Sequence, residues 1–141
     1  MIENTSNNVC VYDKLTYAGN PDNVASVANH QNYRFTKADI NETLLIENIL
    51  RSNQIDWVVN FAAESHVDNS ISGPGVFIQT NINGTFSMLH ASLNYYKTLD
   101  ENQQKQFRFL HVSTDEVFGS LQENDPPFNE QSRYQPNSPY S

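Results

Sequence analysis

The chain has 141 residues, of which 16 are acidic and 8 are basic, and its formal net charge is −8. This excess of negative charge argues against a nucleic-acid partner, which is bound mainly through Lys and Arg, and it equally disfavours an anionic membrane surface. Charged residues make up only 17% of the chain and aromatic residues 11%, so disorder is also a poor interpretation.

Two short strands are predicted in the first part of the chain. Val9–Tyr12 is an apolar strand that ends at Asp13, and Tyr33–Lys37 is a second strand that closes at Asp39. Asp39 stands three residues before Glu42, a spacing compatible with a capping arrangement at the start of a helix.

Two helices are predicted further along the chain. The first extends through Asn53, because apolar residues recur at helical spacing before it. These residues are Leu44, Leu45, Ile49 and Leu50. The second is a long helical segment from about Val76 to Lys97, which follows the punctuation of Gly73-Pro74-Gly75.

Two further strands complete the pattern. Asp56–Ala63 has the continuous apolar character of a strand covered on both faces, and Phe107–Val112 runs into the polar segment Ser113–Glu116. That segment also has the form of a capping box, with Ser three residues before Glu. After Gly119 the chain is predicted to be loop-like.

The element order β-β-α-β-α-β predicts an α/β fold with a doubly wound parallel sheet and helices on both faces. Ligands of such sheets bind at the carboxyl ends of the strands. Polar or small residues occur at all of these ends, namely Asp13, Asp39, Ala62–Ser65 and Thr114–Glu116. This coincidence is the first indication of a functional site.

A glycine-rich turn is missing from the start of the pattern. A dinucleotide-binding fold normally opens with a strand and a glycine-rich turn that meets the pyrophosphate at a helix N-terminus. The chain has five glycines and none forms such a turn before Asp13. The first strand here therefore corresponds to the second strand of that unit.

Metal, disulfide and membrane features are not expected. Cys10 is the single cysteine, which excludes an internal disulfide and a cysteine-rich zinc site, and His30, His90 and His111 have no metal-ligand spacing. The polar first residues do not form a signal peptide, and no apolar run approaches the ~20 residues of a membrane span. We therefore expect a cytoplasmic protein with no metal.

Six local sequences together resemble the dTDP-glucose 4,6-dehydratase family, within the extended short-chain dehydrogenase/reductase superfamily. They occur in order from Asp13 to the last residue. They are Asp13-Lys-Leu-Thr-Tyr-Ala-Gly-Asn20, Ala38-Asp-Ile40, Ala62-Ala-Glu-Ser-His-Val-Asp68, Thr80-Asn81 with Gly84-Thr85, Ser113-Thr-Asp-Glu-Val-Phe-Gly119 and Ser138-Pro-Tyr-Ser141. The Thr-Asp-Glu triplet separates this dehydratase from sugar-nucleotide epimerases.

The resemblance implies an NAD-dependent enzyme that is a homodimer when complete. Its substrate is dTDP-glucose, its product is the 4-keto-6-deoxy sugar nucleotide, and that product feeds deoxysugars such as rhamnose. The Rossmann-like, NAD(P)-binding domain is implied to be incomplete over residues 1–141, without the first strand and without the C-terminal substrate domain.

The resemblance also implies the residues that bind the cofactor. Asp13 would hold the adenosine ribose, with Lys14, Leu15 and Thr16 beside it. A carboxylate here accepts hydrogen bonds from ribose hydroxyls and repels a 2′-phosphate, which favours NAD over NADP. The remaining residues would flank the adenine or line the middle and nicotinamide side. They are Asp39 and Ile40 at the adenine, then Phe61, Ala62, Ala63, Glu64, Ser65 and Thr80.

The implied chemistry uses three proton-handling groups. Tyr140, also at the cofactor, matches the base that takes the 4-hydroxyl proton. Glu116 matches the base that removes the C5 proton, and Asp115 matches the acid that protonates the departing C6 hydroxyl. Thr114 and Ser65 would contact the substrate.

The chain departs from the family pattern at both ends. It lacks the glycine-rich turn, and it ends one residue after Tyr140, before the Lys expected four residues on. In the strand order 3-2-1-4-5 the missing strand lies between the first and third strands seen here. We therefore expect these residues alone to be poorly folded or differently paired. Two alternatives stay open: a dehydratase of another nucleotide sugar such as GDP-mannose, and a non-catalytic remnant that acts with a partner chain.

Overall fold

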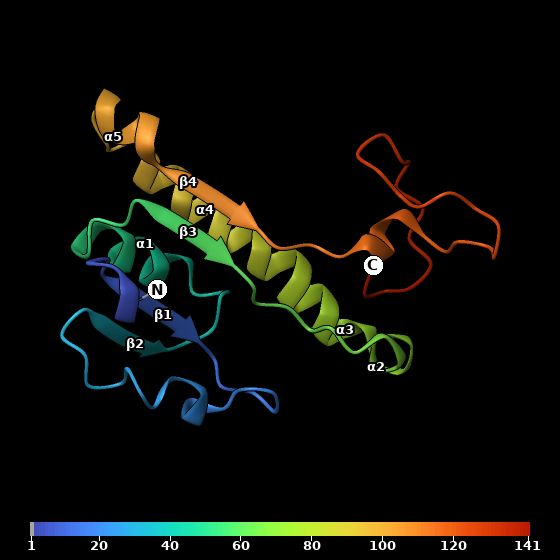
Figure 1. Ribbon diagram of the computed structural model, residues 1–141, viewed down its shortest axis with the longest axis horizontal. Helices are drawn as coiled ribbons and strands as arrows, with labels where there is room; N and C mark the ends of the chain where they lie inside the picture. The colour runs from blue at the N-terminus through green and yellow to red at the C-terminus, as the bar shows by residue number, and fades with distance from the viewer. Residues whose placement is uncertain (1) are drawn as a thin grey trace.

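The computed structural model describes residues 2–141, in which four short strands and the helices around them form an α/β fold (Figure 1). The strands are Val9–Asp13 (β1), Tyr33–Lys37 (β2), Trp57–Asn60 (β3) and Arg108–His111 (β4). All four predicted strands are present, and the two later ones are shorter than predicted. The predicted α/β class is confirmed.

The strands pair in parallel as two separate two-stranded sheets, β1 with β2 and β3 with β4. Among the residues described, β1 and β3 each keep one edge without a strand partner. These pairs are the ones that the order 3-2-1-4-5 contains when its central strand is left out. The expectation of different pairing is therefore wrong, because each pair is held by its own ladder of parallel hydrogen bonds.

The helices follow the strands in chain order. They are Thr43–Ser52 (α1), Val67–Ser72 (α2), Pro74–Phe77 (α3), Thr85–Tyr96 (α4) and Glu101–Gln106 (α5), with a π-helical turn at Ile78–Gly84 (η3) and short 3-10 turns at Ile2–Asn4 (η1), Pro21–Val24 (η2) and Asp115–Phe118 (η4). The predicted long helix thus begins at Pro74 and includes a π-helical turn. No helix in residues 2–141 has the length and apolar character needed to cross a membrane.

The hydrophobic core lies where α1 and α4 pack together over one face of β3. Its buried members are Ile40, Ile46, Leu50, Val58, Met88, Ala91 and Tyr95. Burying one large aliphatic or aromatic side chain contributes about 1.5–3 kcal/mol. Tyr12 of β1 also packs against this cluster, so the two strand pairs share one core.

The first helix begins later than the capping pattern predicts. Its first residue is Thr43, and Glu42 at the N-cap makes no side-chain cap bond. The Asp39 backbone N–H instead donates to Glu42 Oε1 at 3.0 Å, while the Asp39 carboxylate binds other groups. The buried face of α1 consists of Ile46 and Leu50, and Leu44 is 78% exposed.

β3 is covered on one face, not on both as predicted. Val58 and Asn60 are buried beneath the helices, whereas Trp57 is 65% and Val59 is 41% exposed. The reason is that α1 and α4 pack together on the same side of the strand pair. No element of the described part of the chain covers the other side.

Gly84 lies where the π-helical turn touches Ile40. A Cβ at position 84 would overlap the Cγ1 and Cδ1 atoms of that buried side chain. Gly84→Ala gains about 1 kcal/mol of helix propensity but overpacks the core, which costs about 1–3 kcal/mol. We expect net destabilisation of about 1 kcal/mol, measured by urea unfolding. Gly75→Ala is the matched control, since no atom lies within 4 Å of its Cβ, and it should stabilise slightly. Equal effects of the two changes would contradict the overpacking.

Candidate active site at the carboxyl ends of the strands

Asp13 ends β1 and lies in an exposed turn. Its Oδ1 atom accepts a hydrogen bond of 2.6 Å from the Leu15 backbone N–H, and Leu15 has a positive φ of 54°. The turn continues with a bond from the Gly19 N–H to the Thr16 carbonyl. A Cβ at Gly19 would lie 2.6 Å from Leu15 Cα, so this close approach requires glycine. The Asp13 carboxylate keeps lone pairs available for a ligand.

The Asp39 carboxylate binds one residue that follows β1 and one that follows β2. Its Oδ2 atom forms an ion pair of 2.7 Å with Lys14 Nζ, and its Oδ1 atom accepts from the Asn41 N–H and side-chain amide at 2.9 and 2.8 Å. Partial burial alone would raise the pKa of Asp39, but the Lys14 and Asn41 contacts outweigh it and hold the pKa below its ordinary value. The carboxylate therefore stays charged beside Ile40, which is buried.

Tyr12 of β1 contacts the backbone of the same segment. Its phenol donates a 2.8 Å hydrogen bond to the Asp39 carbonyl. Burial, with the charges of Glu42 and Asp39, raises the pKa of Tyr12 to about 12.

The raised pKa of Tyr12 predicts a loss of stability at alkaline pH. An unfolded tyrosine ionises near pH ~10, so the stabilisation is complete below that pH and is lost as the pH rises through about 12. Urea unfolding measured across this window should show a steeper loss for the unchanged protein than for Tyr12→Phe. Parallel curves would contradict this prediction.

The loop after β3 carries the middle group of predicted residues. Phe61, Ala63 and Ser65 are exposed, and Ala62 and Glu64 are partly buried. Glu64 is tied to two other segments. Its backbone N–H and carbonyl bind the side-chain amide of Asn81, and its carboxylate accepts a 3.4 Å hydrogen bond from Tyr17. Thr80, the remaining predicted residue of this group, is partly buried next to Asn81.

The acidic triplet follows β4 and opens the 3-10 turn η4. Thr114 is the N-cap, and its Oγ1 atom accepts from the Glu116 N–H at 3.2 Å. The cap that forms is therefore at Thr114 and not at Ser113, where the capping-box form of the sequence begins, because the turn starts at Asp115. Asp115 is exposed and Glu116 is partly buried. An open cavity of about 550 Å³ lies beside this turn and is lined by Ser113, Thr114, Asp115, Val117, Phe118, Tyr134, Pro136 and Ser141.

The C-terminal segment folds back onto η4, as the red part of Figure 1 shows. The Gln135 N–H donates to the Val117 carbonyl at 3.0 Å, and Tyr134 stacks on Phe118 with ring centroids 5.4 Å apart. Near Tyr140, Ser138 and Ser141 exchange backbone-to-hydroxyl hydrogen bonds of 3.1 and 3.2 Å. This reciprocal pattern is that of a capping box.

The predicted residues thus form two groups in the structure. Contacts join the ends of β1, β2 and β3, whereas the triplet after β4 lies with the C-terminal segment. Within residues 2–141, no hydrogen bond or ion pair connects the two groups. Ser141 lines the cavity beside Thr114 and Asp115, while Tyr140 and Glu116 are not among its lining residues.

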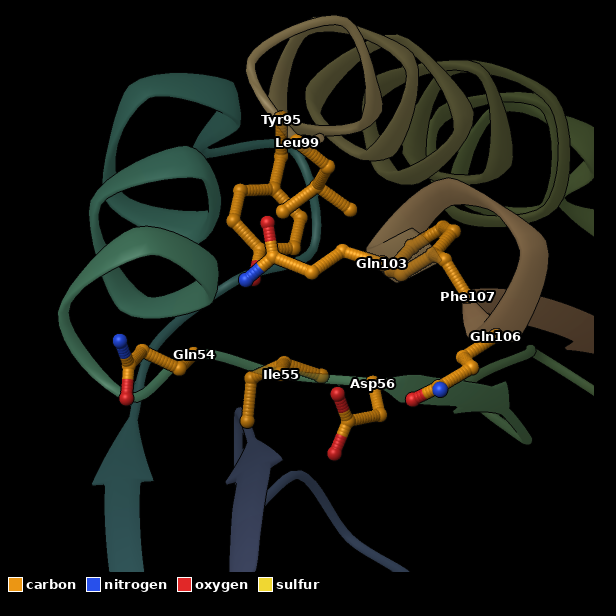
Figure 2. Close-up of a pocket in the computed structure, with 8 residues that line it drawn as sticks. All are labelled: Gln54, Ile55, Asp56, Tyr95, Leu99, Gln103, Gln106 and Phe107. Atoms are coloured by element: carbon orange, nitrogen blue, oxygen red, sulfur yellow. The ribbon is translucent and has the colours of Figure 1, made fainter. Parts of the chain in front are cut away.

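A second cavity, of about 290 Å³, lies at the opposite edge of the fold (Figure 2). Its walls come from the residues just before β3, from the end of α4 and the turn after it, and from α5 with the residue that follows it. They are Gln54, Ile55, Asp56, Tyr95, Leu99, Gln103, Gln106 and Phe107. The Gln103 side chain is already used, because it caps α5 by accepting from the Asp100 N–H. No predicted site residue lines this cavity.

Four residues of the site were not predicted: Tyr12, Tyr17, Asn41 and Asn81. Asn41 carries a local signal, since an Asp followed two residues later by a backbone donor forms an Asx turn. The other three act across 27, 47 and 17 residues of sequence, respectively, and no local pattern predicts such contacts.

Comparison with known proteins gives one family and close relatives. Residues 3–141 match the family model described as GDP-mannose 4,6 dehydratase. The chain is 50% identical over 141 residues to a dTDP-glucose 4,6-dehydratase of Haemophilus influenzae, covering 100% of this chain and 42% of that protein. It is 52% identical over 129 residues to one of Xanthomonas campestris, covering 92% and 36%. The chain therefore spans about two fifths of the length of these curated relatives.

Solved structures agree with the fold and with the predicted resemblance. A dTDP-glucose 4,6-dehydratase of Streptomyces venezuelae with NAD and TYD bound matches with a TM-score of 0.83 and 40% identity, over 99% of this chain and 39% of that one. A UDP-Glc/GlcNAc 4-epimerase of Campylobacter jejuni matches with a TM-score of 0.79 at 22% identity, over 96% and 38%, which supports the fold alone. The resemblance to dTDP-glucose 4,6-dehydratases is confirmed.

Proposed function

The chain belongs to the GDP-mannose 4,6-dehydratase family, and from this we propose that it is the cofactor-binding part of a dTDP-glucose 4,6-dehydratase. The observation that carries the proposal is the position of the acidic side chains. Asp13 is the last residue of β1, and Asp39 and the pair Asp115–Glu116 follow β2 and β4, so all of them lie at the carboxyl ends of parallel strands, which is where such folds bind ligands. The identity of the quoted relatives favours dTDP-glucose over another sugar nucleotide.

The residues present fit the adenosine end of NAD. Asp13 is exposed, and its bond to Leu15 uses one oxygen, which leaves acceptors for ribose hydroxyls. The same negative charge disfavours a 2′-phosphate, so NAD is favoured over NADP. Lys14 and Thr16 lie on the same turn, and Asp39 with Ile40 would flank the adenine.

The loop after β3 would extend the cofactor site. In this proposal Phe61–Ser65 and Thr80 line the middle and nicotinamide side, and Ser65 also reaches the substrate. Exposure of Phe61, Ala63 and Ser65 supports this assignment, because a loop that lines a ligand site needs open faces. When bound, NAD would supply reversible hydride transfer. It would take hydride from C4 of the sugar at the start of the reaction and return it to C6 at the end.

Each remaining proton transfer has a residue of this chain. Tyr140 accepts the proton of the C4 hydroxyl, so that a C4 ketone forms and the C5 hydrogen becomes acidic. Glu116 removes the C5 proton and returns it to C5 when hydride reaches C6, and Asp115 gives a proton to the C6 hydroxyl, which leaves as water. Thr114 hydrogen-bonds the sugar near C4. The neighbouring position of an acid and a base in one 3-10 turn supports this division of roles.

The wider assignment is part of the same proposal. Residues 1–141 are an incomplete Rossmann-like domain of a cytoplasmic enzyme, and the free thiol of Cys10 agrees with a reducing compartment.

The complete enzyme is a homodimer. A row of exposed apolar side chains along η3 and α4 supports an interface there, namely Ile78, Ile82, Phe86, Leu89 and Leu93, and sedimentation of the complete protein tests it.

Product analysis tests the function. Protein expressed from the complete gene is incubated with NAD and either dTDP-glucose or GDP-mannose, and the sugar products are identified by NMR. We expect a 4-keto-6-deoxy sugar from dTDP-glucose only. Turnover of GDP-mannose alone would assign the other substrate, and no turnover of either would indicate the non-catalytic remnant.

A further inference from the structure

The turn between α3 and α4 is π-helical over Ile78–Gly84, where the sequence predicts ordinary helix. A single π-helical turn inside a helix is uncommon and often occurs at a functional site. Asn81 lies in the middle of this turn and is partly buried. None of the roles assigned above includes Asn81.

The side-chain amide of Asn81 binds both backbone groups of one loop residue. Its Oδ1 atom accepts from the Glu64 N–H at 2.8 Å, and its Nδ2 atom donates to the Glu64 carbonyl at 2.9 Å. The loop after β3 has no regular secondary structure, so its backbone groups need such partners. Two bonds in opposite directions fix both the distance and the orientation of the peptide.

The same π-helical turn reaches both halves of the proposed cofactor site. Asn81 holds Glu64, which lies within the stretch Phe61–Ser65, and Glu64 in turn accepts a hydrogen bond from Tyr17 of the turn after β1. Three residues along, Gly84 packs directly against Ile40 beside Asp39. One turn of helix therefore sets the separation between the loop after β3 and the residues after β2.

We propose that Asn81 is a positioning residue for NAD, which holds the loop Phe61–Ser65 in the conformation that the cofactor needs. The inference rests on the proposed function, and it gives Asn81 no contact with the substrate or the reacting atoms. Loss of both bonds would leave the loop free to move. Two ordinary hydrogen bonds correspond to a loss of about 10- to 100-fold in NAD affinity.

Two variants of Asn81 and one neighbour separate this role from a general effect. Asn81→Ala removes both bonds. Asn81→Asp keeps an acceptor for the Glu64 N–H but sets an oxygen against the Glu64 carbonyl. Asn83→Ala is the matched control, because Asn83 lies in the same turn and its side-chain amide donates to Gln79 at 3.1 Å, away from the loop.

The protein expressed from its complete gene is examined by NAD titration and by hydrogen exchange of residues 61–66 without NAD. We expect both Asn81 variants to raise the NAD dissociation constant about 10- to 100-fold and to speed exchange at Glu64, with Asn83→Ala unchanged. Asp100→Ala, which removes the cap of α5, serves as a control for lost stability and should leave NAD binding unchanged.

Each other outcome overturns a defined part of the account. Unchanged NAD affinity in both Asn81 variants, or an equal loss in Asn83→Ala, overturns the positioning role. Unchanged exchange at Glu64 overturns the proposed restraint on the loop. Failure of the unchanged protein to bind NAD overturns the proposed function instead, and the exchange measurement still tests whether Asn81 restrains the loop.

Discussion

Glu116→Gln is expected to reduce turnover of dTDP-glucose by about 100- to 10,000-fold, the usual contribution of a general base. Glutamine has nearly the same shape as glutamate but cannot accept the C5 proton. The bond between the Glu116 N–H and Thr114 Oγ1 uses the backbone, so the 3-10 turn should survive the change. The measurement is exchange of the C5 hydrogen with deuterated solvent, together with product formation.

Glu123→Gln provides the control for this prediction. Glu123 is exposed in the loop-like C-terminal segment and has no part in the proposed chemistry, so its variant should exchange and turn over normally. Undiminished C5 exchange in Glu116→Gln would remove Glu116 from the role of base.

Asp13→Asn is expected to weaken NAD binding by about 10- to 100-fold. Hydrogen bonds to a charged group contribute about 1.5–3 kcal/mol, and each 1.4 kcal/mol corresponds to about a tenfold change in affinity. Asparagine keeps the side-chain oxygen that accepts from the Leu15 N–H, so the turn is preserved while the charge is lost. Because the negative charge also repels a 2′-phosphate, the preference for NAD over NADP should shrink.

Titration with NAD and with NADP measures both effects. Asp22→Asn is the matched control. Asp22 is an exposed acidic residue of η2, close to Asp13 in the sequence, and it lies outside the proposed site. A similar loss of affinity in both variants would point to net charge. No loss in Asp13→Asn would place the ribose elsewhere.

The parts of the fold that the sequence predicts best are those determined by local pattern. β2 has the predicted bounds Tyr33–Lys37, and β1 extends by one residue to Asp13. By contrast, α5 was not predicted, because Glu101–Gln106 is polar on every side and has no buried residue. Its only sequence signal is the capping box of Asp100 and Gln103.

The π-helical turn and the one-sided cover of β3 depend on contacts between distant segments. Local periodicity predicts an ordinary helix through Asn81, and the bond to Glu64 that accompanies the π-helical turn connects residues 17 positions apart. The apolar run around Val58 likewise suggests a strand covered twice, whereas the cover that forms depends on where α1 and α4 pack. These features could not be predicted from neighbouring residues.

The candidate site was predicted in position but not in its contacts. Strand ends alone indicate where Asp13, Asp39 and the acidic triplet lie. The ion pair of Asp39 with Lys14 and the bond from Tyr17 to Glu64 require the relative placement of three loops, which no motif specifies.

The central claim is that the carboxyl ends of these strands bind NAD, and a crystal structure of the complete gene product with NAD tests it most directly. The account predicts that the adenosine ribose hydroxyls lie within hydrogen-bonding distance of the Asp13 carboxylate, with the adenine beside Asp39 and Ile40. A nucleotide bound instead in the cavity at Gln54 and Phe107, or bound without any contact to Asp13, would contradict it.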